Sequence, residues 1–156
     1  MAAIAHLIDH PDNPVPPGAA VGLVVAADGV EIRWATFPPL AAPARGTVLI
    51  LHGRAEYIER WFETVRDLQV RGFAVATFDW RGQGGSTRQA KDPRKGHVGD
   101  FRAYDFDLDV VLREIVPDLP KPLFVLAHST GGLVAFAEAA RLTGVVDRAV
   151  LIAPFL

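Results

Sequence analysis

Residues 123–140, LFVLAHSTGGLVAFAEAA, change character at a single serine. The run before Ser129 is apolar and indicates a buried strand, whereas two glycines and an alanine-rich helical pattern follow the serine. A serine between a buried strand and a helix is the setting of the G-x-S-x-G turn, which exposes the serine hydroxyl at the edge of a sheet. The stretch therefore predicts an α/β fold and a nucleophilic serine at position 129.

The residues around Ser129 fit this turn with one departure. The pattern is Ala127-His128-Ser129-Thr130-Gly131, so alanine stands where the first glycine is commoner. Small residues are needed two positions away on either side, because the strand before the strained turn nearly touches the helix after it. The alternatives are a serine that only caps the helix and a chance match, expected in roughly one such chain in ten. The strand-to-helix setting, in a chain with only two serines, favours the nucleophile.

Apolar runs and helical patterns alternate along the rest of the chain. Strands are predicted at 47–53, 73–80 and 122–127 and from 148, and helices at 57–72, 100–117 and 130–142. Asp28-Gly29, between two β-rich runs, predicts a hairpin before them. The order β-α-β-α-β-α-β predicts a mainly parallel sheet with helices on both faces. Residues 11–18 are turn-rich, and we expect an irregular arm at 1–18 ahead of one domain at 19–156.

The helix predicted after residue 100 carries two more specific expectations. Asp100 is a good N-cap, and the apolar face beyond it is expected to bury Phe101, Tyr104, Leu108, Val111, Leu112 and Ile115. Asp105, Asp107 and Asp109 are expected to form a solvated face and not a cation site, because alternate residues of a helix do not face one another.

A second strand also ends in residues suited to chemistry. The strand at 47–53 ends in His52-Gly53-Arg54, about 75 residues before Ser129. In the fold to which the serine turn belongs, the loop at this place supplies one backbone N–H of the oxyanion hole, and the residue after the serine supplies the other. The corresponding donors are the amides of Arg54 and Thr130, with His52, Gly53 and Gly131 in supporting positions. The alternative is an ordinary glycine that ends a strand.

The segments LHGRAEYIERW, FDWRGQGGS, VLAHSTGGLVA and VLIAPFL together resemble the α/β-hydrolase fold, in particular its monoacylglycerol lipase and lysophospholipase-like subgroup. The resemblance covers the chain from about residue 20 to its end. It implies a serine esterase or lipase that acts on small acyl esters, with Ser129 as nucleophile. The charged Arg54 departs from the pattern, and its side chain is expected to alter access to the site or to attract anionic head groups.

The acid and the histidine that should activate Ser129 are not in the expected order. They normally follow the serine in this fold, yet only 27 residues follow Ser129 and no histidine is among them. Of the earlier histidines, His128 should point away from Ser129 and His52 should brace the oxyanion loop. His97 should support a turn.

We therefore expect an α/β-hydrolase domain truncated after about the sixth strand, with lid, acid and histidine beyond Leu156. Alone, such a chain should have negligible esterase activity. The alternative is a non-catalytic α/β-hydrolase-like module for binding or interaction.

Composition and the remaining motifs exclude other classes of protein. A net charge of −2 argues against nucleic acid as a partner, and the absence of cysteine excludes disulfides and thiolate metal sites. His6 and His10 lack a third ligand, and Gly82-x-Gly84 lacks the last glycine of a dinucleotide loop, so we expect neither metal nor cofactor. No segment resembles a secretory signal or a membrane helix. We expect a cytoplasmic protein, with transient membrane contact only through the lid; the sequence does not indicate its oligomeric state.

Overall fold

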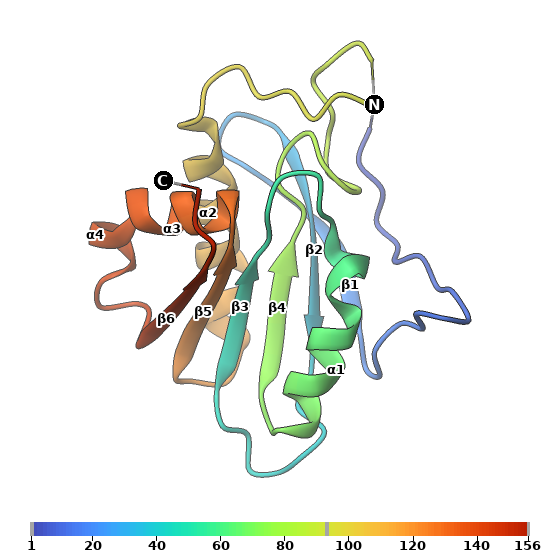
Figure 1. Cartoon of the computed structure of the whole chain (residues 1–156), viewed down its shortest axis with the longest axis vertical. Helices are drawn as coiled ribbons and strands as arrows, with labels where there is room; N and C mark the ends of the chain where they lie inside the picture. Colours follow the sequence, from blue (N-terminus) through green and yellow to red (C-terminus); the bar gives the residue numbers. More distant parts are fainter. Residues whose placement is uncertain (1, 93, 156) are drawn as a thin grey trace.

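A six-stranded sheet forms the centre of the protein (Figure 1). The computed structural model describes residues 2–92 and 94–155. The strands are β1 (Ala20–Val25), β2 (Glu31–Phe37), β3 (Thr47–Leu51), β4 (Ala74–Phe78), β5 (Leu123–His128) and β6 (Arg148–Ile152). The helices are α1 (Phe62–Val70), α2 (Ala103–Glu114), α3 (Thr130–Ala137) and α4 (Ala139–Leu142), with 3₁₀ turns η1 (Ile58–Trp61) and η2 (Val116–Asp118).

The strand order is β1-β2-β4-β3-β5-β6. β1 pairs with β2, and β2 with β4, in antiparallel fashion, whereas the pairs from β4 through β3 and β5 to β6 are parallel. The hairpin turns at Gly29, whose φ of 84° lies in the left-handed region that glycine reaches without strain. The predicted mostly parallel sheet with an N-terminal hairpin is confirmed.

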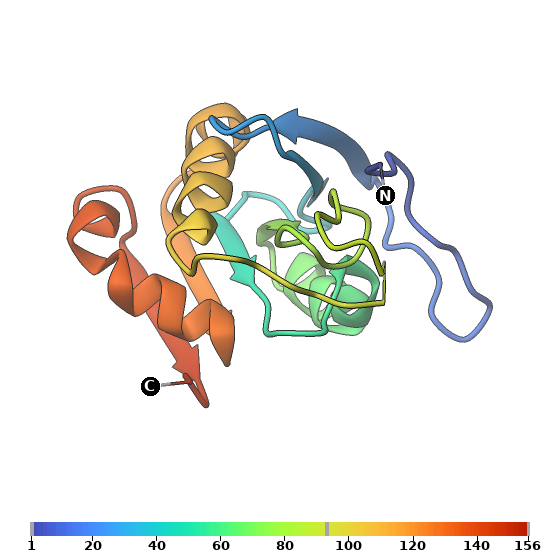
Figure 2. The same cartoon turned by 90° about the horizontal axis from the view of Figure 1, so that it is seen from above.

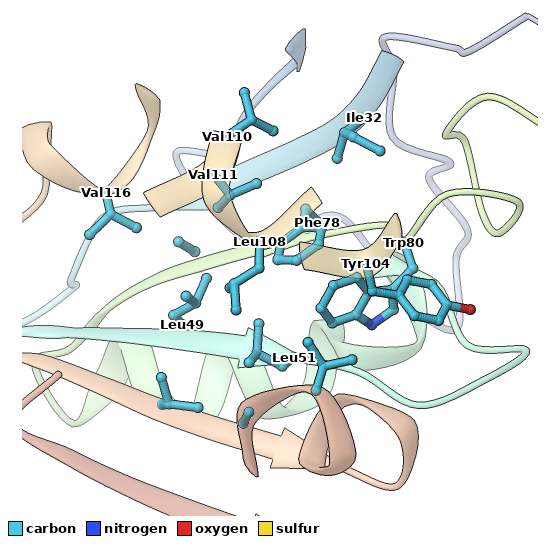
Figure 3. Close-up of a cluster of buried hydrophobic side chains, with 14 of the residues drawn as sticks. Ile32, Leu49, Leu51, Phe78, Trp80, Tyr104, Leu108, Val110, Val111 and Val116 are labelled. Carbon is cyan, nitrogen blue, oxygen red and sulfur yellow. The ribbon is translucent and has the colours of Figure 1, made fainter. Parts of the chain in front are cut away.

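Helices cover both faces of the sheet, as the sequence predicts (Figure 2). Side chains alternate along β3, because successive residues of a strand point to opposite faces. Val48 and Ile50 pack in the cluster that contains Phe62 of α1. Leu49 and Leu51 pack on the other face, in the cluster with residues of α2 and α3 such as Leu108 (Figure 3).

Three helix boundaries differ from the prediction. The helix expected from residue 57 begins as the 3₁₀ turn η1, and α1 proper starts only at Phe62. Asp100 does not cap α2 directly, because its Oδ1 accepts the amide of Arg102 (2.9 Å) and forms a separate turn before the helix. Phe101 lies in this turn and is 39% exposed, so its predicted burial is wrong. The helix expected at 130–142 is divided at Glu138 into α3 and α4.

The prediction of a solvated aspartate face on α2 is wrong for Asp107. Its side chain is fully buried, and it accepts hydrogen bonds from the guanidinium and from the backbone amide of Arg81. Asp107 follows Tyr104 by three residues and precedes Leu108, so it lies on the apolar face of the helix. A buried carboxylate is stable there because Arg81 supplies its donors.

Residues 2–18 contain no helix or strand, only an isolated bridge between His10 and Asn13. This segment is attached to the domain by hydrogen bonds. The amide of Ile4 donates to the Gly85 carbonyl (2.9 Å), and the Asn13 side chain donates to the Glu59 carbonyl (2.8 Å). Across residues 2–92 and 94–155, no helix combines the length and the apolar character needed to cross a bilayer.

Candidate active site

Ser129 joins β5 to α3 with φ of 49° and ψ of −115°, a conformation that non-glycine residues adopt only under strain. Its amide donates to the Ile152 carbonyl at the end of β6 (3.1 Å). Its carbonyl accepts the amides of Leu133 and Phe155, both at 3.1 Å. The Ser129 side chain makes no capping hydrogen bond to α3, so helix capping does not account for this residue. The strained turn is held by hydrogen bonds of its backbone, and Ser129 is half-buried.

Gly131 and Ala127 allow α3 to lie close to β3. A Cβ atom added to Gly131 would overlap the backbone carbonyl oxygen of Leu51. Ala127 is fully buried and lies opposite Leu51 in the parallel pair of β3 and β5. A larger side chain at either position would push α3 and the Ser129 turn away from the sheet.

The loop after β3 lies against Ser129. A Cβ atom added to Gly53 would stand 3.1 Å from Cβ of Ser129 and 3.0 Å from Nδ1 of His128, tighter than ordinary van der Waals contact. The segments that the sequence places about 75 residues apart therefore meet, and glycine at position 53 permits the approach.

Two side chains that the motifs did not identify hold this loop. Glu56 accepts the Gly53 amide (2.7 Å) and the Trp61 indole N–H (3.2 Å) on Oε2. Gln83 accepts the amide of Ala55 on Oε1 (2.5 Å), and Ala55 has a positive φ of 61°. Such contacts between loops have no periodic signature in the sequence.

Arg54 and Thr130 line one cavity of about 860 Å³ beside the Ser129 turn. Thr130 is the first residue of α3, where a backbone N–H has no acceptor inside the helix. The Arg54 amide donates to no acceptor among the described residues. Both residues predicted to supply the oxyanion donors thus line the same cavity.

His52 lies beneath the loop and is fully buried. Its Nδ1 lies 2.8 Å from the Gly53 carbonyl oxygen, and its own carbonyl accepts the indole N–H of Trp80 (2.8 Å). The Nε2 atom lies 3.6 Å from Asp79 Oδ1. These contacts fit the expected bracing of the loop and leave His52 no free path to the cavity.

His128 is the last residue of β5 and contacts Glu56 and Trp61. Its Nδ1 is 3.0 Å from Oε1 of Glu56, and its ring packs against Trp61 at 6.2 Å between centroids. Among the described residues, no recorded hydrogen bond joins the Ser129 hydroxyl to a histidine or a carboxylate. The described part of the chain also contains no group of three potential metal ligands.

The second serine of the chain, Ser86, belongs to a buried polar network behind the site. Its hydroxyl accepts the amide of Arg33 (2.9 Å) and donates to the carbonyl of Asp79 (2.6 Å). The guanidinium of Arg33 binds both oxygens of Glu59 at 2.8 Å and Oδ2 of Asp79 at 2.6 Å. Sequence reasoning missed this network, although Arg33 alternates with Ala35 and Phe37 on one face of β2 and so had to be buried.

The charges of this network shift the pKa values of Asp79 and Arg33. Burial opposes ionisation of Asp79, but His52 and the Arg33 guanidinium outweigh it and hold the pKa of this carboxyl below its usual range. Burial also opposes ionisation of Arg33, whereas Asp79 and Glu59 raise its pKa overall. Asp79 and Arg33 are therefore ionised at neutral pH, and the network ties the end of β4 to β2 and η1.

A second ion cluster fixes the loop after β4 to α2 and to the hairpin. Arg81 donates to Asp107 on one side and to Asp28 on the other, with shortest distances of 2.7 and 2.6 Å. The hydrogen bond from Arg81 lowers the pKa of Asp28. Burial raises the pKa of Asp107 to about 6, against the attraction of Arg81.

The sequence matches a known family and several characterised proteins. The family model described as "Serine aminopeptidase, S33" matches residues 42–156. Lysophospholipase L2 of Escherichia coli strain K12 is 36% identical over 128 residues, which are 81% of this chain and 37% of that protein. Monoacylglycerol lipase of Mycolicibacterium smegmatis is 32% identical over 127 residues, 81% of this chain and 43% of that protein. The chain spans about two fifths of the length of these curated relatives.

Solved structures share the fold at lower sequence identity. A thermostable carboxyl esterase from Bacillus coagulans, in complex with glycerol, superimposes with a TM-score of 0.69 at 21% identity, over 85% of this chain and 43% of that chain. Cfl2 from Burkholderia cenocepacia gives a TM-score of 0.71 at 22% identity, over 97% of this chain and 46% of that chain. At these identities the similarity shows the fold alone.

Proposed function

Since the chain belongs to the α/β-hydrolase superfamily, in its monoacylglycerol lipase and lysophospholipase-like subgroup, we propose that Ser129 is the nucleophile of a carboxylic ester hydrolase. The substrates are small acyl esters of the acyl-glycerol or lysophospholipid kind. One observation carries the proposal: the strained backbone of Ser129 at the junction of β5 and α3, pressed against the Gly53 loop. Strain of this kind persists at functional sites because the surrounding structure enforces it.

The proposed reaction runs through an acyl-enzyme. The Ser129 oxygen attacks the ester carbonyl carbon as a base takes its proton, and the carbonyl oxygen becomes negatively charged. The amides of Arg54 and Thr130 stabilise this oxyanion, a contribution of about 3–4 kcal/mol per donor in well-studied hydrolases. The bond to the alcohol then breaks and the alcohol leaves with a proton. Water then attacks the acyl carbon as the base takes its proton, the bond to the Ser129 oxygen breaks, and Ser129 regains a proton as the carboxylic acid leaves.

The proposal places the acid and the histidine of the triad beyond Leu156, together with a lid that contacts the lipid surface. His128, which adjoins Ser129 in sequence, and His52, which follows β3, contact other groups. The competing proposal, a non-catalytic binding module, rests on these contacts, because they leave Ser129 without a base among the described residues. The coding sequence downstream of Leu156 separates the two: an acidic residue followed by a histidine favours the hydrolase, and a stop codon favours the module.

A fluorophosphonate probe tests the nucleophile directly. In the whole protein that contains this chain, we expect the probe to label Ser129 and the Ser129→Ala variant to lose the label, because the probe reacts only with an activated serine. Heat-denatured protein serves as the control for non-specific labelling. Equal labelling of both folded proteins would refute the assignment.

A further inference from the structure

The cavity beside Ser129 is lined by more positive than negative side chains. Arg54, Arg88, Arg94 and Lys95 line it, and among the described residues Glu56 is the one carboxylate in its wall. Glu56 is already engaged, because its Oε2 accepts the Gly53 and Trp61 N–H groups and its Oε1 lies 3.0 Å from His128. A cleft lined by one sign of charge concentrates ligands of the opposite sign.

Two of these cations are uncommitted. The guanidinium of Arg88 donates to the carbonyls of Gly82 and Gly84, and that of Arg94 pairs with Asp92. Arg54 and Lys95 are exposed, and neither forms a recorded hydrogen bond or ion pair within residues 2–92 and 94–155. Arg54 comes from the loop after β3 and Lys95 from the long loop before α2, so the two reach the cavity from different segments.

Gln83 adds an independent indication of a ligand. It lines the same cavity and is only 4% exposed. Its Oε1 accepts the Ala55 amide, but its buried Nε2 has no hydrogen-bond partner among the described residues. Buried polar groups nearly always have partners, so this donor remains available to an acceptor that the described residues do not supply.

We infer that Arg54, Lys95 and the Gln83 amide form a site for a phosphate group on the alcohol part of the substrate, so that the enzyme selects phosphate-bearing acyl esters over neutral glycerides. The inference rests on the proposed function. The proposed oxyanion donors Arg54 and Thr130 lie in the cavity wall and place the ester carbonyl there. The acyl chain is uncharged, so the cations serve the alcohol part. A phosphate offers acceptor oxygens to two cations and one amide at once.

Two esters with the same dodecanoyl chain, monododecanoyl glycerol and its glycerol phosphate counterpart, test the inference in the whole protein. The measured quantity is the ratio of kcat/KM for the phosphate ester to kcat/KM for the neutral ester. We expect this ratio to exceed one and to fall about tenfold in Lys95→Gln and in Arg54→Gln, since each loses one charged contact. Lys91 is an exposed cation in the same loop as Lys95 but does not line the cavity. Lys91→Gln should therefore keep the wild-type ratio.

Binding gives a readout that does not depend on turnover. Dodecyl phosphate should bind the Ser129→Ala protein more tightly than dodecanol, and Lys95→Gln should remove the difference; circular dichroism checks the fold of each variant. If both esters are hydrolysed equally and the variants leave the ratio unchanged, the inference is wrong while the proposed function stands. If neither ester is hydrolysed and Ser129 is not labelled by fluorophosphonate, the proposed function fails and the inference fails with it.

Discussion

At the residue scale, the geometry of the candidate site depends on small residues at positions 127 and 131. Ser129 keeps its strained conformation because its backbone forms hydrogen bonds with Ile152, Phe155 and Leu133. The neighbouring Gly131 lets α3 approach β3, since any side chain there would meet the Leu51 carbonyl. The alanine at position 127, the departure from the G-x-S-x-G pattern, lies buried within β5 and does not prevent the turn.

Gly131→Ala should therefore weaken both the fold and the site. The added methyl group has no space against the Leu51 carbonyl, and we expect a loss of about 1–3 kcal/mol in the free energy of unfolding. Fluorophosphonate labelling of Ser129 should slow at the same time, because the turn moves with α3. Urea unfolding measures the first effect. Gly99→Ala is the control, since an added Cβ atom at Gly99 meets nothing within 4 Å and should cost about 0.5 kcal/mol or less. Equal losses in the two variants would contradict the steric argument.

At the scale of elements, the sequence predicted the strands and the order of the helices because buried faces give apolar residues a regular spacing. That spacing does not show which polar side chains will pair with one another. The spacing of Tyr104, Asp107, Leu108 and Val111 marks one face of α2, yet a carboxylate on that face reads as solvated until its partner is known. That partner, Arg81, is 26 residues away in a loop without periodicity. The fold of α2 was thus predictable and its docking was not.

The ion pair of Arg81 with Asp28 should make the docking of the hairpin depend on pH. The pKa of Asp28 is lowered in the folded protein, so its stabilising contribution is present above about pH 4 and is lost as the pH falls through the lowered value. Asp28→Asn should cost about 1 kcal/mol in the free energy of unfolding at pH 7, because Arg81 is buried and the Asp28 side chain is 31% exposed. The difference from the wild type should vanish towards pH 2. Asp107 faces the same guanidinium and its raised pKa acts in the opposite direction; because the charge of Asp28 contributes to raising that pKa, Asp28→Asn also changes the contribution of Asp107.

Urea unfolding of the two proteins between pH 2 and 7 measures this difference. Asp12→Asn is the control, because the Asp12 side chain is 94% exposed and its 3.8 Å ion pair with His10 is too exposed to contribute much. It should follow the wild type throughout. A difference between Asp28→Asn and the wild type that stays constant with pH would show that the charge of Asp28 is not the cause.

At the scale of the whole molecule, the buried network around Arg33 joins segments that lie far apart in the sequence. Arg33 of β2 reaches Asp79 after β4, Glu59 of η1 and the His6 carbonyl in the N-terminal segment. The Ser129 turn and the loop at Gly53 were predictable, because a motif and the strand order bring them together. The arrangement of residues 2–18 was not, because it depends on side chains that bond to backbone atoms far away in sequence.

Arg33→Met should destabilise the whole molecule. It removes the partner of two buried carboxylates, and breaking a buried ion network in this way costs about 3–5 kcal/mol in the free energy of unfolding. Hydrogen exchange should also become faster at the amide of Ile8, which donates to Oε1 of Glu59 (3.1 Å), because Glu59 is no longer held. Arg60→Met, an exposed arginine in η1, should cost about 0.5 kcal/mol or less. If Arg33→Met does not fold, Arg33→Lys is the second variant. It retains one charge, so its free energy of unfolding should lie between those of the wild type and Arg33→Met. If Arg33→Lys lost no more stability than Arg60→Met, and exchange at Ile8 stayed at its wild-type rate, the network would not be what joins these segments.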